Sequence, residues 1–576
     1  MRLDASLVFE KKTNTWHVIM RPVCPHDTQD VNTTNQYMTN QFGVDFTVVK
    51  TCCGKSLRGW LLGIHQYTAM QQIQMNSKTF HIQPIPTALM NHIINLGSHT
   101  QELSPVGMAQ LSNLSSYRSL FPYQARGVEF AIARQCRAMI CDEMGLGKTR
   151  QALTILHYLM QTNATLIAIV VCPASLRVNW LREIHGVIHG SINALILPPT
   201  KKKRKTASTQ PIEQTNPHPG VTIHIVSYAH LANNTPSTKY DIVICDESHY
   251  LKSTKSKRFK SVSRVVKRGG ARLIQLSGTP STKTRDLYAQ LKLLDPILFK
   301  QFAKFRRGPD TEILYFGDRY CDPKKVFLGH NRSVIQHSGL TRAWELHALL
   351  QHFMIRRDKI QVLPNLPSKG RRVTRLIGLD QKQRCYFERE MDGIQEKRER
   401  LGSRAAERML MALMRESNLE KVSHLCHFVK DMFQNTSTLS NQNKYLIFAH
   451  HHATLDALAH VMQQLQIPHI QIDGRVTSTM RQSQVDRFQN DASLQVAILG
   501  ITAAGTGLNL FKANKVVFAE LTWNQNDILQ AECRAHRLGQ TRNVDVSFII
   551  LSGSVDEIVW KSINRKTTQS YAVLDD

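Results

Sequence analysis

The sequence has few of the cysteine patterns that mark metal sites or disulfide frameworks. Its 11 cysteines are scattered through 576 residues, and only Cys52 and Cys53 are adjacent. No Cys-x-x-Cys pair and no Cys/His cluster has zinc-binding spacing. Cys141, Cys172 and Cys245 lie in apolar runs, where cysteine acts as a small hydrophobic residue. This usage suits a reducing compartment and gives no sign of a zinc module.

Long hydrophobic runs are also absent. The longest strongly apolar run, Leu166–Cys172, is too short to span a bilayer. The N-terminus, Met1-Arg2-Leu3-Asp4, is charged within a few residues, and no signal-like apolar core follows it. We therefore expect a soluble intracellular protein with no membrane partner.

Acidic residues are scarce relative to basic ones. Asp and Glu number 44 against 73 Lys and Arg, which gives a formal net charge of +29. An excess of this size favours a polyanionic partner, most simply nucleic acid. The alternative, a surface merely solvated by lysine, fits this magnitude poorly. Hydrophobic residues make up 42% of the chain, so it can bury large cores.

Two regions of the chain alternate short apolar runs with helical stretches. Such alternation predicts an α/β fold, with mainly parallel sheets and helices on both faces. The runs are continuously apolar because both faces of such a sheet are buried. They are Ala138–Cys141, Leu166–Cys172, Val221–Val226, Ile242–Cys245 and Leu273–Leu276, then Tyr445–Phe448, Val496–Leu499, Val516–Phe518 and Val546–Leu551.

The stretch DEMGLGKT, which begins at Asp142, has the arrangement of a phosphate-binding loop between a strand and a helix. Gly145 and Gly147 would let backbone N–H groups curl around an anion, and the next helix would point its positive end there. Lys148 would reach the terminal phosphates, and the Thr149 hydroxyl would bind Mg²⁺. The strict pattern has Gly where this chain has Asp142, and an ordinary strand-to-helix turn is the alternative.

Two adjacent carboxylates follow the apolar run Ile242–Cys245. Asp246 would hold Mg²⁺, and Glu247 would position and deprotonate an attacking water. The alternative is a solvated acidic turn. The stretch Leu276–Pro280 ends another strand, and its hydroxyls could contact the carboxylate pair and couple the nucleotide to the other apolar-rich region of the chain. Taken alone, it would be an ordinary turn.

Arg534 and Arg537 are three residues apart and so share one face of a helix, far along the chain from the phosphate loop. Phosphoryl transfer needs cations where negative charge develops, and arginine fingers supply them. A basic surface helix is the alternative. Gln124, just before the first strand, could bond an adenine edge in both directions and so select ATP, although a single Gln is a weak signal.

Together these stretches resemble the helicase superfamily 2 ATPases of the Swi/Snf-related group, which has Asp at the first position of its phosphate loop. The resemblance covers about residues 115–566, with further matches at Val171–Leu176, Asp246–His249, Leu276–Pro280, Thr522–Asn524 and Gln530–Gln540. Within this group the chain is most similar to the HepA-related, or HARP-type, annealing helicases. That similarity rests on Asp246–Lys252, Phe316–Asp322, Met354–Arg357, Leu363–Pro367 and Ile501–Leu508.

The resemblance implies two RecA-like lobes that bind ATP and Mg²⁺ in their cleft, with DNA across both. It also implies a nucleotide contact at Gly507, within the Ile501–Leu508 stretch. The implied activity is ATP-driven movement on double-stranded or forked DNA, with strand rewinding during replication stress and repair. A single-strand-binding protein is a candidate partner, and the nucleus is the expected location. The alternatives are a chromatin or protein–DNA remodelling ATPase and a catalytically silent DNA-binding scaffold.

Four domains are expected. They are an N-terminal accessory module over 1–104, a first RecA-like lobe over 105–295, a linker and protruding helical region over 296–440, and a second RecA-like lobe over 441–576. The accessory module could bind DNA or serve only for packing. The basic run Lys201–Lys205 is expected to be an exposed insertion, either a nuclear-import signal, a DNA-facing loop or a plain solvated charge run. The stretch Gln381–Glu416 is expected to form a solvated helix or helix pair.

Overall fold

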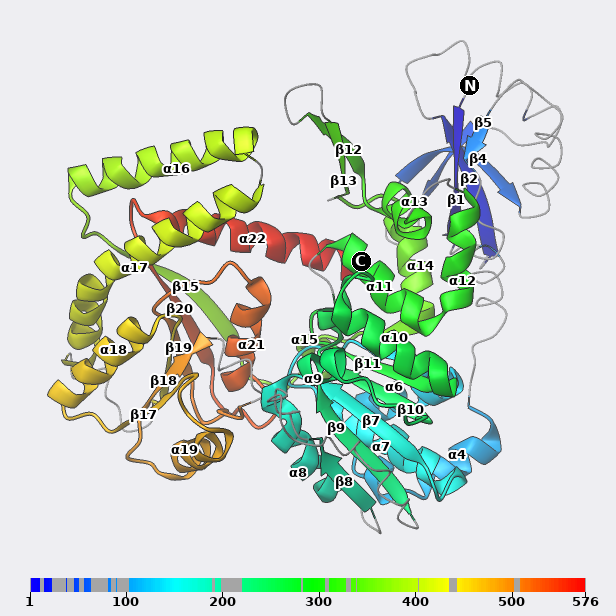
Figure 1. The fold of residues 1–576 in the computed structure, drawn as a ribbon, viewed down its shortest axis with the longest axis horizontal. Helices are drawn as coiled ribbons and strands as arrows, with labels where there is room; N and C mark the ends of the chain where they lie inside the picture. Colours follow the sequence, from blue (N-terminus) through cyan, green and yellow to red (C-terminus); the bar gives the residue numbers. More distant parts are fainter. Residues whose placement is uncertain are drawn as a thin grey trace, which may run out of the picture.

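The computed structural model has two α/β lobes side by side, with a small sheet from the N-terminal part of the chain next to the first lobe (Figure 1). It describes residues 103–188, 192–197, 220–280, 283–305, 310–327, 333–337, 339–401, 403–434, 443–501 and 508–574, together with Met38, Met90 and five N-terminal strands. Within these ranges, no helix combines the length and apolar character needed to cross a bilayer. The Lys201–Lys205 run and Gly507 lie outside the described residues.

The N-terminal strands form a sheet of order β3-β4-β2-β1-β5, in which β5 runs parallel to β1 and the other pairs are antiparallel. Val18 and Leu62 are fully buried and belong to the same hydrophobic cluster as Leu346 and Leu349 of the first-lobe helix α14. The N-terminal sheet therefore shares its core with the first lobe. Its strands are β1 (Arg2–Glu10), β2 (Thr15–Pro22), β3 (Phe46–Lys50), β4 (Ser56–Gly63) and β5 (His81–Gln83).

The first lobe is built on a parallel sheet of order β14-β6-β11-β10-β7-β9-β8. Along β6, Met139 packs into one hydrophobic cluster, while Ala138 and Ile140 pack into a second cluster on the opposite face. Both faces are thus covered, as the continuous apolar runs predict. The strands are β6 (Arg137–Ile140), β7 (Ile167–Cys172), β8 (Ile192–Ile196), β9 (Val221–Ser227), β10 (Ile242–Asp246), β11 (Arg272–Leu276) and β14 (Met354–Ile355).

Helices surround this sheet, and a two-stranded hairpin projects from the same part of the chain (Figure 1). The hairpin pairs β12 (Pro323–Phe327) with β13 (Ser333–His337). The helices are α4 (Pro105–Ser112), α5 (Ser115–Arg118), α6 (Pro122–Ala133), α7 (Lys148–Thr162), η1 (Ala174–Leu176), α8 (Arg177–Val187), α9 (Tyr228–Asn233), η2 (Ser248–Leu251), α10 (Lys257–Gly269), α11 (Thr284–Leu294), α12 (Pro296–Lys300), η3 (Gln301–Phe305), α13 (Thr311–Tyr320), α14 (Ala343–Phe353) and α15 (Lys359–Val362).

The second lobe repeats the plan with a parallel sheet of order β15-β20-β19-β16-β18-β17. Its strands are β15 (Lys369–Leu376), β16 (Tyr445–Ala449), β17 (His469–Ile472), β18 (Val496–Gly500), β19 (Lys515–Phe518) and β20 (Val544–Leu551). Its helices are α16 (Gln381–Leu401), α17 (Ser403–Gln434), α18 (His452–Gln464), α19 (Ser478–Asn490), α21 (Gln525–Ala535) and α22 (Val555–Leu574). The prediction of two parallel α/β lobes is confirmed.

The charged stretch forms two helices, α16 and α17, which pack against each other. They are not wholly solvated, because Phe387, Ile394 and Leu413 are buried in the same cluster as the second-lobe sheet. The predicted domain boundaries stay predictions. Two strands within the predicted linker region nevertheless pair with the lobes, since β14 joins the first sheet and β15 the second.

A buried ion pair joins α13 to α14 at the base of the hairpin. The Arg319 guanidinium donates to the Glu345 carboxylate at 2.6 and 2.7 Å, and neither side chain is exposed. Tyr320 also donates to Glu345 at 2.7 Å. Loss of Arg319 would leave the buried Glu345 carboxylate without its hydrogen-bonded cation, which costs far more than loss of a surface pair.

We expect Arg319→Met to lower the free energy of unfolding by about 3–5 kcal/mol, measured by chemical denaturation. Lys255→Met is the matched control, because the Lys255–Asp310 pair is 74% and 44% exposed. That control should change stability by less than about 1 kcal/mol. Equal effects of the two substitutions would contradict the role given to burial.

Candidate active site between the lobes

The predicted phosphate loop lies between β6 and α7, at the carboxyl end of the strand next to the edge strand β14. Gly145 and Gly147 have left-handed φ values of +93° and +78°, which residues with a side chain rarely adopt. The loop feeds the N-terminus of the 15-residue helix α7, whose first two residues are Lys148 and Thr149. Lys148 Nζ donates to the carbonyl of Asp142 at 2.9 Å. Backbone N–H groups, a helix N-terminus and an ammonium thus converge at one place.

Asp142 anchors the loop through a contact with a residue far along the chain, which no local sequence pattern predicts. Its fully buried carboxylate accepts from Arg357 Nε at 2.8 Å and from Arg357 Nη2 at 2.6 Å. Gln151 of α7 donates to the same carboxylate at 2.8 Å. Arg357 closely follows the short edge strand β14, so the linker side of the sheet holds the loop in place. In the sequence alone, Arg357 appears only as part of the stretch Met354–Arg357 that supports the family resemblance, and no role is predicted for it.

Asp246 is the last residue of β10, and Glu247 directly follows it, so the two carboxylates stand at the end of a strand as predicted. Asp246 accepts a hydrogen bond from Trp180 Nε1 at 2.8 Å, and Glu247 adopts a left-handed φ of +50°. The carboxylate of Glu247 lies 3.3 Å from His249 Nδ1. His249 Nδ1 in turn lies 3.4 Å from the Ser277 hydroxyl, so the Leu276–Pro280 stretch reaches the carboxylates through His249.

The two carboxylates have opposite pKa shifts. Burial raises the pKa of Asp246 to about 6, the charge of Glu247 adds to the rise, and the Trp180 hydrogen bond opposes it. Burial also acts to raise the pKa of Glu247, but the interactions with His249, Lys148 and Arg534 outweigh it and lower that pKa below its usual range. Glu247 is therefore fully ionised at neutral pH, where Asp246, with a pKa of about 6, is mostly ionised as well.

Helix α21 of the second lobe brings Arg534 to this site. The helix ends at Ala535, and Arg537 follows its C-cap residue His536, so the expectation that both arginines share one face of a helix is wrong. Gln530 Nε2 lies 3.4 Å from Glu247 Oε1, which places one face of α21 against the carboxylate pair. Burial lowers the pKa of Arg534 to about 10, and the charge of Arg537 adds to the effect, so the guanidinium remains charged at neutral pH. A Cβ built on Gly145 would come within 3.0 Å of Arg537 Cβ, so Arg537 lies against the phosphate loop.

Gln124 lies beside the loop, but its side chain is used inside the protein. It is 1% exposed, donates to the Leu146 carbonyl at 3.0 Å and accepts from the Phe121 backbone at 3.1 Å. A role in adenine recognition stays a prediction, as does the role of Gly507, which the described residues do not include. Trp180, His249, Gln530 and Arg357 complete the site and have no distinctive spacing in the sequence.

The residues present fit a nucleotide with Mg²⁺. Arg534 Nε is buried and has no hydrogen-bond partner among the described residues, as expected of a group that awaits an anion. Nowhere in the described part of the chain do three or more His, Cys, Asp or Glu side chains form a group that could hold a metal ion. Asp246 and Thr149 are the residues that would hold Mg²⁺ together with phosphate oxygens, which is how this cation is usually held.

Two parallel α/β lobes with a phosphate loop, paired carboxylates and arginines across the interface define a RecA-like core of the helicase type. Residues 123–444 match the SNF2-related domain, and residues 420–539 match the helicase conserved C-terminal domain. The chain belongs to the SNF2-related family.

Similar proteins carry names that refer to chromatin regulation and DNA annealing. The chain is 31% identical to the Xenopus tropicalis SWI/SNF-related matrix-associated actin-dependent regulator of chromatin subfamily A-like protein 1, over 88% of this chain and 51% of that protein. It is 33% identical to the Homo sapiens DNA annealing helicase and endonuclease ZRANB3, over 79% of this chain and 40% of that protein. The chain thus spans about half or less of the length of these relatives.

A solved structure also matches, the Sulfolobus solfataricus SWI2/SNF2 ATPase core in complex with dsDNA. It is 21% identical and covers 79% of this chain and 97% of its own, with a TM-score of 0.34.

We expect Gly145→Ala to lower kcat/KM for ATP by at least about tenfold, since a left-handed φ costs a residue with a side chain about 1–2 kcal/mol and the new methyl group would press on Arg537. Gly186→Ala in α8 is the matched control, because a Cβ there would meet no atom within 4 Å. Steady-state ATP turnover measures both variants. Unchanged turnover in Gly145→Ala would contradict the packing described for Arg537.

Proposed function

We propose that this chain is a DNA-dependent ATPase that moves on double-stranded or forked DNA and rewinds or remodels branched DNA. The observation that carries the proposal is the meeting of α21 with the phosphate loop and carboxylates. Glu247 lies against Gln530, and Gly145 lies against Arg537. Each lobe supplies only part of the machinery, so hydrolysis can depend on how the lobes are placed.

Each residue has a distinct role in the proposed reaction. ATP supplies the phosphoryl group that is transferred to water when it is bound in this site. Lys148 and the backbone N–H groups around Gly145 hold the phosphates. Glu247, kept ionised by its cationic neighbours, orients the water and accepts its proton. Arg534 and Arg537 stabilise the charge that develops on the phosphate oxygens.

The charge distribution supports a DNA partner. Helix α10 buries Phe259 and Val262. The same helix exposes six basic side chains, Lys257, Arg258, Lys260, Arg264, Lys267 and Arg268. Contacts with phosphates give affinity without base readout, which a protein that moves along DNA needs. Nuclear location and contact with a single-strand-binding protein follow from this proposed role in replication stress and repair.

We expect Lys148→Ala and Glu247→Gln each to lower ATP turnover at least about 100-fold while DNA affinity changes little, because neither side chain lies in the proposed DNA-binding surface. Turnover by phosphate release and affinity by fluorescence anisotropy measure the two effects separately. Wild-type turnover in either variant would show that the site is assigned wrongly.

The preferred substrate is tested by ATP turnover with forked DNA, linear duplex or nucleosomes, with a strand-annealing assay alongside. We expect forked DNA to stimulate turnover most and complementary strands to be rewound in an ATP-dependent way. Stimulation by nucleosomes above all other substrates would favour chromatin remodelling instead. Equal turnover with and without DNA would exclude a translocase.

A further inference from the structure

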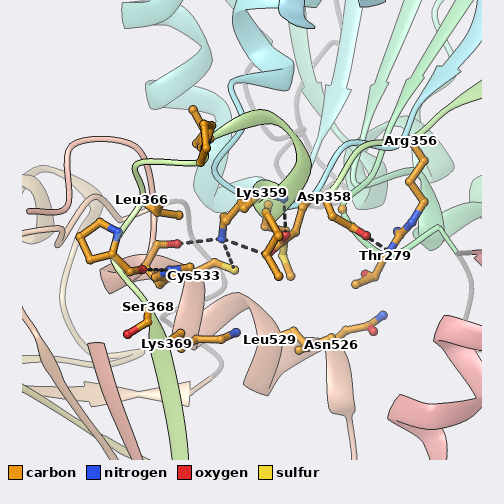
Figure 2. A pocket seen from close by; sticks show the side chains of 18 of the residues that line it. Thr279, Arg356, Asp358, Lys359, Leu366, Ser368, Lys369, Asn526, Leu529 and Cys533 are labelled. Carbon is orange, nitrogen blue, oxygen red and sulfur yellow. Dashed lines mark hydrogen bonds and ion pairs between the residues drawn. The ribbon is translucent and has the colours of Figure 1, made fainter. Parts of the chain in front are cut away.

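A cavity of about 500 Å³ lies between the two lobes, along a face of α21 that adjoins the face toward the carboxylates. The first lobe contributes Met144 and Thr279 to its wall, and α21 contributes Leu529 and Cys533. Figure 2 shows Lys359, from the short linker helix α15, reaching across to the end of α21 near Cys533. Nothing in the proposed reaction uses this lysine.

Helix α21 has two functional faces. Leu529 and Cys533 are four residues apart and line the cavity. Gln530 and Arg534 are also four apart, one position further round the helix, and face Glu247. Because a helix moves as a rigid body, a residue that fixes the cavity face also fixes the arginine face.

Lys359 is held by groups from both lobes. Its side chain is 2% exposed. On the first-lobe side, its ammonium lies 3.1 Å from Glu143 Oε1, and its backbone N–H donates to Glu143 Oε2 at 2.9 Å. On the second-lobe side, the ammonium donates to the His536 carbonyl at 2.7 Å and to Cys533 Sγ at 3.3 Å.

These contacts connect the phosphate loop and the segment after α21 on both sides of the lobe interface. Glu143 is two residues before Gly145, and His536 is directly before Arg537. Gly145 and Arg537 lie against each other. Lys359 thus ties together the two segments whose contact forms the site.

We propose that Lys359 is a positioning residue that sets Arg534 and Arg537 against the phosphate loop. It makes no hydrogen bond or ion pair with the carboxylate pair or the arginines, and it acts through the loop and the C-terminal end of α21. This inference rests on the proposed ATP hydrolysis.

The electrostatics agree with a structural tie that needs a cation. The His536 carbonyl is at the C-cap of α21, where a helix carries partial negative charge that a cation stabilises. Burial acts to raise the pKa of Glu143, but the charge and hydrogen bonds of Lys359 outweigh it and lower that pKa. A neutral side chain of similar length would fill the space and lose both attractions.

The test is Lys359→Met in the full chain, with DNA-stimulated ATP turnover and equilibrium ATP binding measured side by side. We expect kcat to fall by about 10- to 100-fold, because a small displacement of the arginines costs this much. The dissociation constant for ATP should change by less than about threefold, since the loop backbone and Lys148 are untouched. Lys359→Arg keeps the cation and should restore part of the lost kcat.

Two further variants separate positioning from a general loss of stability. Glu143→Gln removes the charge of the first-lobe partner of Lys359 and should reproduce the loss of kcat. This variant keeps the proposal testable even if Lys359→Met does not fold. In the variant that combines Lys359→Met and Glu143→Gln, the fold decrease in kcat should be no more than about twice that of the worse single variant, because both substitutions break the same contact. Lys369→Met is the matched control, a cavity-lining lysine whose partner Glu532 is in the same lobe as its own strand β15. Its kcat should stay within about twofold of wild type, because Arg371 still pairs with Glu532 at 2.7 Å.

The outcomes separate the two proposals. A wild-type chain that does not hydrolyse ATP with DNA overturns the proposed function. Normal wild-type turnover with unchanged kcat in Lys359→Met, or in Glu143→Gln if Lys359→Met does not fold, overturns only the role of Lys359. That role is also overturned if Lys369→Met loses as much kcat as Lys359→Met, or if ATP binding is lost while kcat is kept.

Discussion

The packing of Arg537, which directly follows the C-cap of α21, against the phosphate loop is the contact on which the site depends. The first lobe has the loop and carboxylates, and the second has the arginines. Arg537 can approach because Gly145 has no side chain to fill the space between them. The same glycine adopts a left-handed φ. Its lack of a Cβ therefore permits both this backbone conformation and the close approach of Arg537.

Buried ion pairs fix segments that are distant in the sequence. Asp142 of the loop pairs with Arg357 of the linker, and Lys421 of α17 pairs with Asp556 of α22 at 2.6 Å, with the side chains of the second pair at most 2% exposed. Pairs of this kind add little net stability over well-packed apolar residues, because both ions lose their hydration. Their effect is selective, since an alternative packing would leave a buried charge without a partner.

Local patterns predicted much of the fold and of the candidate site. Buried parallel strands are continuously apolar, and the loop, the carboxylates and the arginines each have a short signature. The hydrophobic pattern did not predict the edge strands β14 and β15. The first is only two residues long, and the second is rich in Lys and Arg, with most of its residues exposed. The roles proposed for Lys359 and Arg357 depend on partners far along the chain, and no local residue spacing predicts such contacts. The catalytic roles themselves remain predictions.

The shared core of the N-terminal sheet and the first lobe has a consequence for how the chain folds. Val18 and Leu62 are in one cluster with Leu346 and Leu349, and β1 contacts α14. Such continuity makes the sheet and the lobe one cooperative unit rather than two separable modules. A truncated chain that begins after the sheet would expose apolar surface on α14, so its loss of activity would reflect incomplete folding as much as the loss of a binding surface.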